Sequence, residues 1–176
     1  MKGGMVSIMA SYVKFIDGLS GWTGKWVAWV IIPNVLALVY EVVARYILNS
    51  PTIWSYEVTY FLYGSHFLLG AAYALSVDAH IRIDIFTSHF SPRTRAVIDL
   101  IGYLLLFFPV VITLVYAGGQ YVMQSFEMGE QSGLSPWRPY LYPYKAVITI
   151  SFILLLLQGI ACFIRNISLL ARGEKP

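Results

Sequence analysis

Four stretches of this chain are long and apolar enough to cross a lipid bilayer as helices, and this feature limits its possible folds most. They cover about residues 26–48, 57–77, 96–117 and 145–164, and a helix needs roughly 20 apolar residues to span the hydrocarbon core. Hydrophobic residues make up 58% of the chain and charged residues only 12%, a composition that suits a lipid environment. The sequence predicts an all-α membrane protein with four transmembrane helices in a single domain, residues 1–176.

Two prolines lie inside these stretches. Pro33 falls in the first and Pro109 in the third. Proline lacks a backbone N–H group and its ring clashes with the preceding turn, so each is expected to kink its helix. Neither excludes a membrane span, because neighbouring helices can satisfy the freed carbonyl groups.

An amphipathic segment, residues 1–25, precedes the first span. Its apolar residues recur at helical spacing; they are Met5, Ile8, Met9, Tyr12, Ile16 and Leu19. This pattern predicts a helix that lies in the membrane interface, with a frayed tail as the alternative. Polar residues interrupt the segment, whereas a signal peptide has an uninterrupted apolar centre, so we expect the segment to be retained.

Lysine and arginine are distributed unevenly among the connections, and this asymmetry predicts the orientation of the chain. The N-terminal segment, the connection between the second and third spans, and the tail are basic. Their basic residues are Lys2, Lys14, Lys25, Arg82, Arg93, Arg95, Arg165, Arg172 and Lys175. Residues 49–56 contain none. Both termini and residues 78–95 are therefore predicted to be cytoplasmic, and residues 49–56 and 118–144 to face outwards.

Glu41 and Arg45 lie four residues apart in the first span, the spacing at which side chains on one helix face meet. At a rise of about 1.5 Å per residue, Glu41 lies about 10 Å inside the outer end of its span, where an unpaired charge is costly. We interpret the two residues as a structural ion pair, joined by Glu57 across the short hairpin. An ion or proton site is the alternative, but a permanent cation one turn away suits it poorly.

His66, Gly70, Ala74 and Asp78 are spaced by four and form one stripe along the second span. Small residues on a membrane helix allow another helix to approach closely, so the stripe is predicted to be a helix-packing surface or a subunit interface. His66 is the only histidine inside a span, and this chain alone cannot supply the two facing histidines of a haem site. No cofactor is expected.

The connection between the second and third spans contains an alternating segment. Its polar residues His80, Arg82 and Asp84 alternate with isoleucines, which separates a polar side from an apolar side in an extended segment at the membrane surface. A metal site of His80, Asp84 and His89 lacks the spacing of a known motif, and Arg82 repels a cation. No metal is expected there.

The connection after the third span combines acidic residues, prolines and aromatic residues. Glu127 and Glu130 come first, and several prolines and aromatic residues follow between positions 135 and 144. Prolines stiffen such a segment, and aromatic residues anchor it at the interface. A membrane anchor and a docking surface for an external partner both explain this pattern.

The sequence contains no nucleophile and base pair, no glycine-rich phosphate loop and no metalloprotease signature, so the protein is not expected to be an enzyme. The net charge of +3 is modest, and no basic run with interleaved aromatic residues suggests a nucleic-acid partner. Cys162 is the single cysteine and is expected to be a small packing residue.

Several segments, taken in order, resemble the small membrane subunit of TRAP transporters, the DctQ-type family, over nearly the whole chain. They are Arg45-Tyr46, then Pro51, Trp54 and Glu57, then Gly70 to Ala74 running into Asp78, His80 to Asp84, Pro92 and Arg95, Ser135 to Trp137, and Gln158-Gly159. No single segment is specific to the family, but their order and spacing together are.

The resemblance implies a subunit of a three-part, sodium-coupled transporter for an organic acid in the bacterial inner membrane. In such systems an extracytoplasmic binding protein captures the acid, a large permease subunit transports it, and the small subunit supports the permease. It implies that the outer loops help to dock the binding protein, through Trp54, Glu127, Glu130, Trp137 and Arg138. It also implies that the segment from His80 to Asp84 braces the cytoplasmic edge.

Two functions of other classes are alternatives. A small multidrug-type, proton-coupled exporter also has four helices and a glutamate in the first. Its loops are very short and its glutamate is central and isolated, whereas Glu41 is off-centre beside Arg45. A haem- or quinone-binding anchor of a respiratory enzyme is the other alternative.

Overall fold

Helices form most of the chain in the computed structural model, which describes residues 2–77 and 90–172. In chain order they are α1 (Lys2–Trp29), α2 (Ile31–Tyr46), α3 (Ser55–Ser76), α5 (Pro92–Gly102), the π-helical segment η1 (Tyr103–Phe107), α6 (Phe108–Glu127) and α7 (Tyr142–Arg172). The β-structure among these residues is one isolated bridge between Gln131 and Tyr140. The all-α prediction is confirmed for the described part of the chain.

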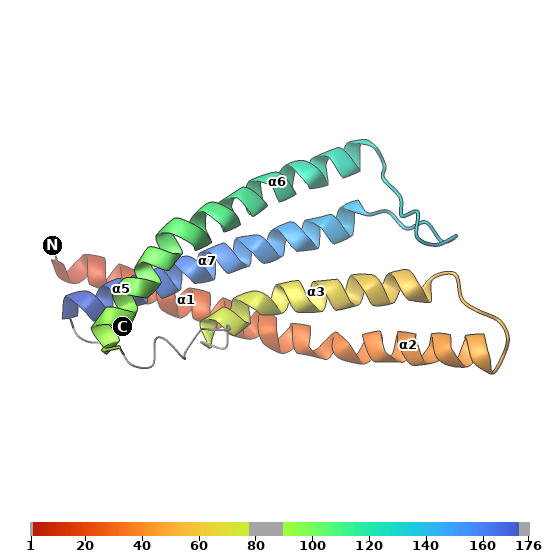
Figure 1. Cartoon of the computed structure of the whole chain (residues 1–176), viewed down its shortest axis with the longest axis horizontal. Coiled ribbons are helices and arrows are strands. Elements are labelled where there is room, and N and C mark those ends of the chain that lie inside the picture. The colour runs from red at the N-terminus through yellow and green to blue at the C-terminus, as the bar shows by residue number, and fades with distance from the viewer. Residues whose placement is uncertain (1, 78–89, 173–176) are drawn as a thin grey trace.

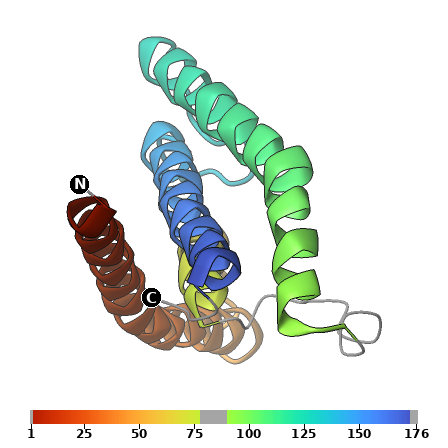
Figure 2. The same ribbon diagram turned by 90° about the vertical axis from the view of Figure 1, so that its left-hand side faces the viewer.

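The helices form four rods, because α1 leads into α2, and α5 leads through η1 into α6 (Figure 1). The start of α1, the end of α7 and the whole of α5 lie at one end of the bundle, which we call the terminal end (Figure 1). The α2–α3 turn and the α6–α7 loop lie at the opposite end, the loop end. α7 is central and packs against α1, α3, α5 and α6 (Figure 2).

The packed core of this bundle is small. One cluster joins Val13 of α1 to Ala161 of α7, and a second joins Leu75 of α3, Tyr103 of η1 and Cys162 of α7. Many large apolar side chains elsewhere point away from the bundle. An apolar surface of this extent is expected where lipid or another subunit, rather than water, surrounds the helices.

Both prolines stand beside an interruption in helix geometry. Pro33 lies in the first turn of α2, directly after the turn at Val30 that separates α1 from α2. Ahead of Pro109, the chain widens into η1, where the N–H of Phe108 donates to the carbonyl of Tyr103. A π-bulge of this kind bends a helix, and Figure 2 shows the change of direction between α5 and α6. The two expected interruptions are present.

Three of the rods in the described residues are long and apolar enough to cross a membrane: Ser7–Tyr46, Arg93–Glu127 and Tyr142–Ala171. The fourth, α3, has 22 residues, which is a sufficient length. It is less apolar because it contains four tyrosines, three serines, Glu57 and His66. The prediction of four spans is therefore confirmed for three rods, and α3 differs from them by its composition.

The N-terminal segment is longer than predicted. α1 has 28 residues and does not end before the first span at residue 25. It leads into α2, so that Ser7–Tyr46 forms one apolar stretch of 40 residues. The missing boundary has a simple cause, since no helix-breaking residue stands between Lys25 and Pro33. At about 1.5 Å per residue the stretch measures about 60 Å, twice the thickness of a hydrocarbon core.

Candidate functional site

The turn between α2 and α3 is organised around the carboxylate of Glu41. Its Oε1 accepts a hydrogen bond of 2.8 Å from Nε of Arg45 and also contacts the Nη2 group of that guanidinium. Its Oε2 accepts from the backbone N–H of Thr52 at 3.1 Å and from the Thr52 hydroxyl. The structure thus brings Glu41 and Arg45 together. A carboxylate engaged on both oxygens differs from the isolated glutamate of a proton-coupled exporter.

Glu57 lies away from this pair. Glu57 is in the first turn of α3 and is fully buried, with 0% of its surface exposed. Its Oε1 accepts a hydrogen bond of 2.8 Å from the Ser135 hydroxyl in the α6–α7 loop. Ser55 faces α2 instead, because it donates to the carbonyl of Ala37 at 2.8 Å. Two residues along a helix point about 200° apart. The structure therefore turns Glu57 towards the loop and does not bring it to Arg45.

The second carboxylate oxygen of Glu57, Oε2, is buried and has no hydrogen-bond partner among the described residues. A buried polar atom without a partner is costly. The bond from Ser135 is consequently the contact that compensates the burial of this side chain.

Lys145 fixes the α6–α7 loop to the bundle. Its ammonium group contacts the Glu130 carboxylate and lies 3.4 Å from the ring centroid of Tyr121, while its side chain is only 7% exposed. The hydrogen-bonded ammonium lowers the pKa of Glu130 below its ordinary value. A backbone bond of 2.8 Å from the Ser132 N–H to the Pro139 carbonyl closes the loop.

The five predicted docking residues all lie at the loop end, in different surroundings. Trp54 stacks on Tyr40 with ring centroids 5.8 Å apart, and Glu130 is bound to Lys145. The exposed ones are Glu127, Trp137 and Arg138. The loop end therefore presents an aromatic, acidic and basic surface on two neighbouring connections.

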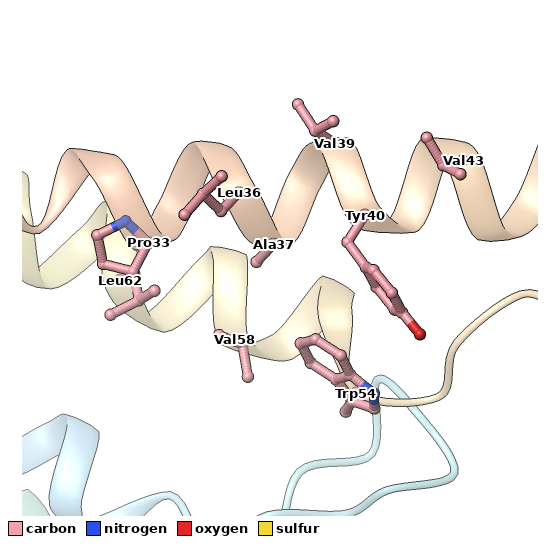
Figure 3. Close-up of a pocket in the computed structure, with 9 residues that line it drawn as sticks. All are labelled: Pro33, Leu36, Ala37, Val39, Tyr40, Val43, Trp54, Val58 and Leu62. Carbon is pink, nitrogen blue, oxygen red and sulfur yellow. The ribbon is translucent and has the colours of Figure 1, made fainter.

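An apolar groove of about 680 Å³ runs between α2 and α3 beside the Tyr40–Trp54 stack (Figure 3). Its lining residues are Pro33, Leu36, Ala37, Val39, Tyr40, Val43, Trp54, Val58 and Leu62. None of them is charged, so the groove offers apolar packing and no catalytic chemistry.

The predicted stripe on α3 divides between two surroundings. His66 faces α1, where its Nδ1 lies 2.9 Å from the carbonyl oxygen of Val27. Gly70 has open space beside its α-carbon, and Ala74 is half-buried. The remaining members of the predicted interface and metal alternatives lie outside the described residues: Asp78, His80, Arg82, Asp84 and His89. The stripe therefore does not pack against one internal neighbour.

Beside Gly70, α3 carries large exposed aromatic residues that were not among the predicted interface residues. Tyr56, Tyr60, Tyr63 and Phe67 recur at intervals of three or four residues and are 47% to 69% exposed. This spacing places them on one side of the helix. Together with Gly70 and Ala74 they form the open face of α3. Tyrosines at helical spacing in an apolar stretch were the signal available in the sequence.

A polar network between α1 and α7 was also missed. Gln158 is 0% exposed; its Oε1 accepts from the Ser20 hydroxyl at 2.7 Å, and its Nε2 donates to Asp17 at 2.9 Å. Asp17 also pairs with Arg165. A glutamine that follows four leucines was the signal in the sequence. Among the described residues, no group of three or more histidines, cysteines and carboxylates could hold a metal ion.

A family model described as the DctQ component of tripartite ATP-independent periplasmic transporters matches residues 34–169. The matched region covers well over half of the chain and includes the Glu41–Arg45 pair, the open face of α3 and the α6–α7 loop. A comparison with curated proteins found no match.

Proposed function

The chain belongs to the family of DctQ components of tripartite ATP-independent periplasmic transporters, and on this premise we propose that it holds the large permease subunit against the open face of α3. It is a membrane subunit of such a transporter. In this proposal it is non-catalytic, supports sodium-coupled uptake of an organic acid by the permease, and helps to dock the extracytoplasmic binding protein.

The observation that carries the proposal is the polarity of the open face. Tyr63 is 60% exposed and lies near the middle of α3, whereas Tyr60 already contacts the ring of Tyr144 in α7. A hydroxyl group in hydrocarbon has no hydrogen-bond partner and is costly to place there. At a protein interface, the same side chain contributes contact area and finds a partner for its hydroxyl group. The face therefore suits a protein neighbour better than it suits lipid.

The open space beside Gly70 also favours a protein neighbour over lipid at this face. A side chain added there would meet open space, so packing among the described residues does not require this glycine. Small residues permit the backbones of two membrane helices to approach closely. We assign Gly70 and Ala74 to the contact with a permease helix.

The other sides of α3 are fixed within the chain. Ser55 bonds to α2, Glu57 to the α6–α7 loop and His66 to α1. A surface held in place before binding loses less conformational entropy when its partner arrives. This arrangement is consistent with a scaffold whose open face has a set position.

The orientation belongs to the same proposal. The excess of basic residues supports a cytoplasmic position for the terminal end and an outward position for the loop end. Trp54, Trp137 and Arg138 then form part of the docking surface for the binding protein, and the Lys145–Glu130 contact holds the α6–α7 loop in place. Membrane lipid covers the remaining apolar surface of the helices.

The proposal is tested by reconstituting the purified chain into proteoliposomes, alone and with the permease and binding protein encoded beside it. Uptake of the acid held by the binding protein is expected only when all three proteins and a sodium gradient are present. Uptake or drug efflux by the chain alone would identify a self-sufficient transporter. Full uptake by the permease and binding protein without the chain would remove its role as a needed subunit.

A further inference from the structure

α1 carries a ridge of large apolar side chains that no described part of the chain covers. Ile8, Phe15, Trp22, Trp26 and Trp29 are between 62% and 72% exposed. Four of them recur every seven residues, and Trp26 is one turn from Trp22, so they follow one side of the helix. Val13, Ile16 and Val27 of the same helix are buried, which shows that the ridge points away from the bundle.

Two lysines lie beside this ridge. Lys14 and Lys25 are exposed and are eleven residues apart, about three helical turns, so they share one edge of α1. Gly18 and Gly21 lie between them, and each has open space beside its α-carbon. The nearby carboxylate of Asp17 is engaged by Arg165 and Gln158. No described carboxylate forms an ion pair with either lysine.

The length of the α1–α2 rod indicates where the ridge lies relative to the bilayer. α2 has 16 residues, or about 24 Å at 1.5 Å per residue, and with the end of α1 it nearly spans a core of about 30 Å. The rest of α1 therefore extends beyond the hydrocarbon. The axis changes direction between α1 and α2 (Figure 2). Ile8 and Phe15 would face water unless α1 lies along the surface of the bilayer.

We propose that α1 binds anionic phospholipids at the terminal end of the bundle. The ridge enters the upper acyl region, where tryptophan is favoured, and Lys14 and Lys25 contact phosphate groups across the gap left by Gly18 and Gly21. A helix with an apolar side next to a basic edge binds a charged leaflet in this way. This surface is separate from the open face of α3, so it does not depend on the permease contact.

The test uses the full-length chain in nanodiscs of phosphatidylcholine with a minority of phosphatidylglycerol. Trp22 is kept as the reporter, with Trp26, Trp29, Trp54 and Trp137 replaced by phenylalanine. Bromine atoms on the acyl chains of one lipid or the other quench tryptophan fluorescence on contact. We expect brominated phosphatidylglycerol to quench Trp22 more strongly than an equal amount of brominated phosphatidylcholine.

The double variant Lys14→Gln with Lys25→Gln is expected to abolish this preference while leaving quenching by phosphatidylcholine. Arg138→Gln is the matched control, because it removes an exposed basic residue at the loop end, and it should leave the preference unchanged. Equal quenching by the two lipids in the native background overturns the proposal. So does a Trp22 that neither lipid quenches, or one that loses quenching when the permease is co-reconstituted, since a protein then covers the ridge.

Discussion

The hydroxyl group of Ser135 donates to Oε1 of Glu57 at 2.8 Å and ties the α6–α7 loop to the first turn of α3 across 78 positions of sequence. Ser135→Ala leaves the buried Glu57 carboxylate without its described partner. Such a loss costs roughly 1–3 kcal/mol, so the thermal unfolding temperature in detergent should fall clearly. Ser50→Ala, at an exposed position of the α2–α3 turn, is the control and should change little.

A second variant separates this bond from general packing. Replacing both partners by apolar groups, as in Glu57→Met with Ser135→Ala, removes the unpaired polar atoms along with the bond. The double variant should unfold at a higher temperature than Ser135→Ala alone. If it is less stable than the single variant, the bond is not what stabilises this site.

The two members of the Glu41–Arg45 pair should differ in importance. The Glu41 side chain is 12% exposed and also accepts two hydrogen bonds from Thr52, whereas the Arg45 side chain is 51% exposed. Glu41→Gln should therefore destabilise the α2–α3 turn more than Arg45→Gln does. Circular dichroism during heating measures both effects. Equal losses would mean that the ion pair, not the capping of Thr52, holds the turn.

The helices and their proline interruptions could be predicted because apolar runs and missing backbone donors act locally. The Glu41–Arg45 contact was predictable for the same reason, since a spacing of four residues fixes it. The partners of Glu57 and Gln158 could not be predicted. The partner of Glu57 is Ser135, 78 positions away, and the partner of Gln158 is Ser20, 138 positions away. A polar residue in an apolar helix indicates that a partner exists, but the sequence does not identify that partner.

The end of the N-terminal helix shows a different limit of prediction from sequence. Its apolar pattern correctly indicated a helix, but the prediction separated it from the first span at residue 25. The chain stays helical to Trp29 and resumes at Ile31, because the turn is placed by Pro33 and not by the change in amphipathic pattern. The open face of α3 was not predicted in full because the stripe was defined by its small residues at a spacing of four, and Tyr63 near the helix centre does not belong to that series.

Acid should weaken the attachment of the α6–α7 loop. The Lys145 ammonium lowers the pKa of Glu130 from its ordinary value of 4.5. A carboxylate with a lower pKa in the folded state contributes stability that is present above its unfolded pKa and is lost as the pH falls through the folded value. The unfolding temperature should thus decline below pH 4.5 more steeply for the native chain than for Glu130→Gln. Parallel curves for the two proteins would contradict this.

Cysteine labelling in intact cells tests the proposed orientation. In a Cys162→Ser background, cysteines at Ser50 and Gly133 should react with an impermeant thiol reagent, and one at Ser7 should not. All three positions are exposed, whereas Ser132 is only 2% exposed and would label poorly on either side. If only the cysteine introduced at Ser7 reacts, the loop end faces the cytoplasm and the proposed orientation is reversed.

The last prediction concerns two glycines whose replacement by leucine should impair different properties of the protein, stability in one case and permease binding in the other. Gly159 of α7 lies against the ring of Phe107, whereas Gly70 has open space beside it. Gly159→Leu should overpack the bundle and cost about 1–3 kcal/mol of the isolated chain's stability. Gly70→Leu should leave the unfolding temperature unchanged and reduce co-purification with the permease, because the new side chain blocks the close approach of a helix. Gly102→Leu, also beside open space but in α5, is the control and should preserve both properties. If Gly70→Leu co-purifies as well as the native chain, the open face of α3 is not the permease contact, whatever the family of the protein.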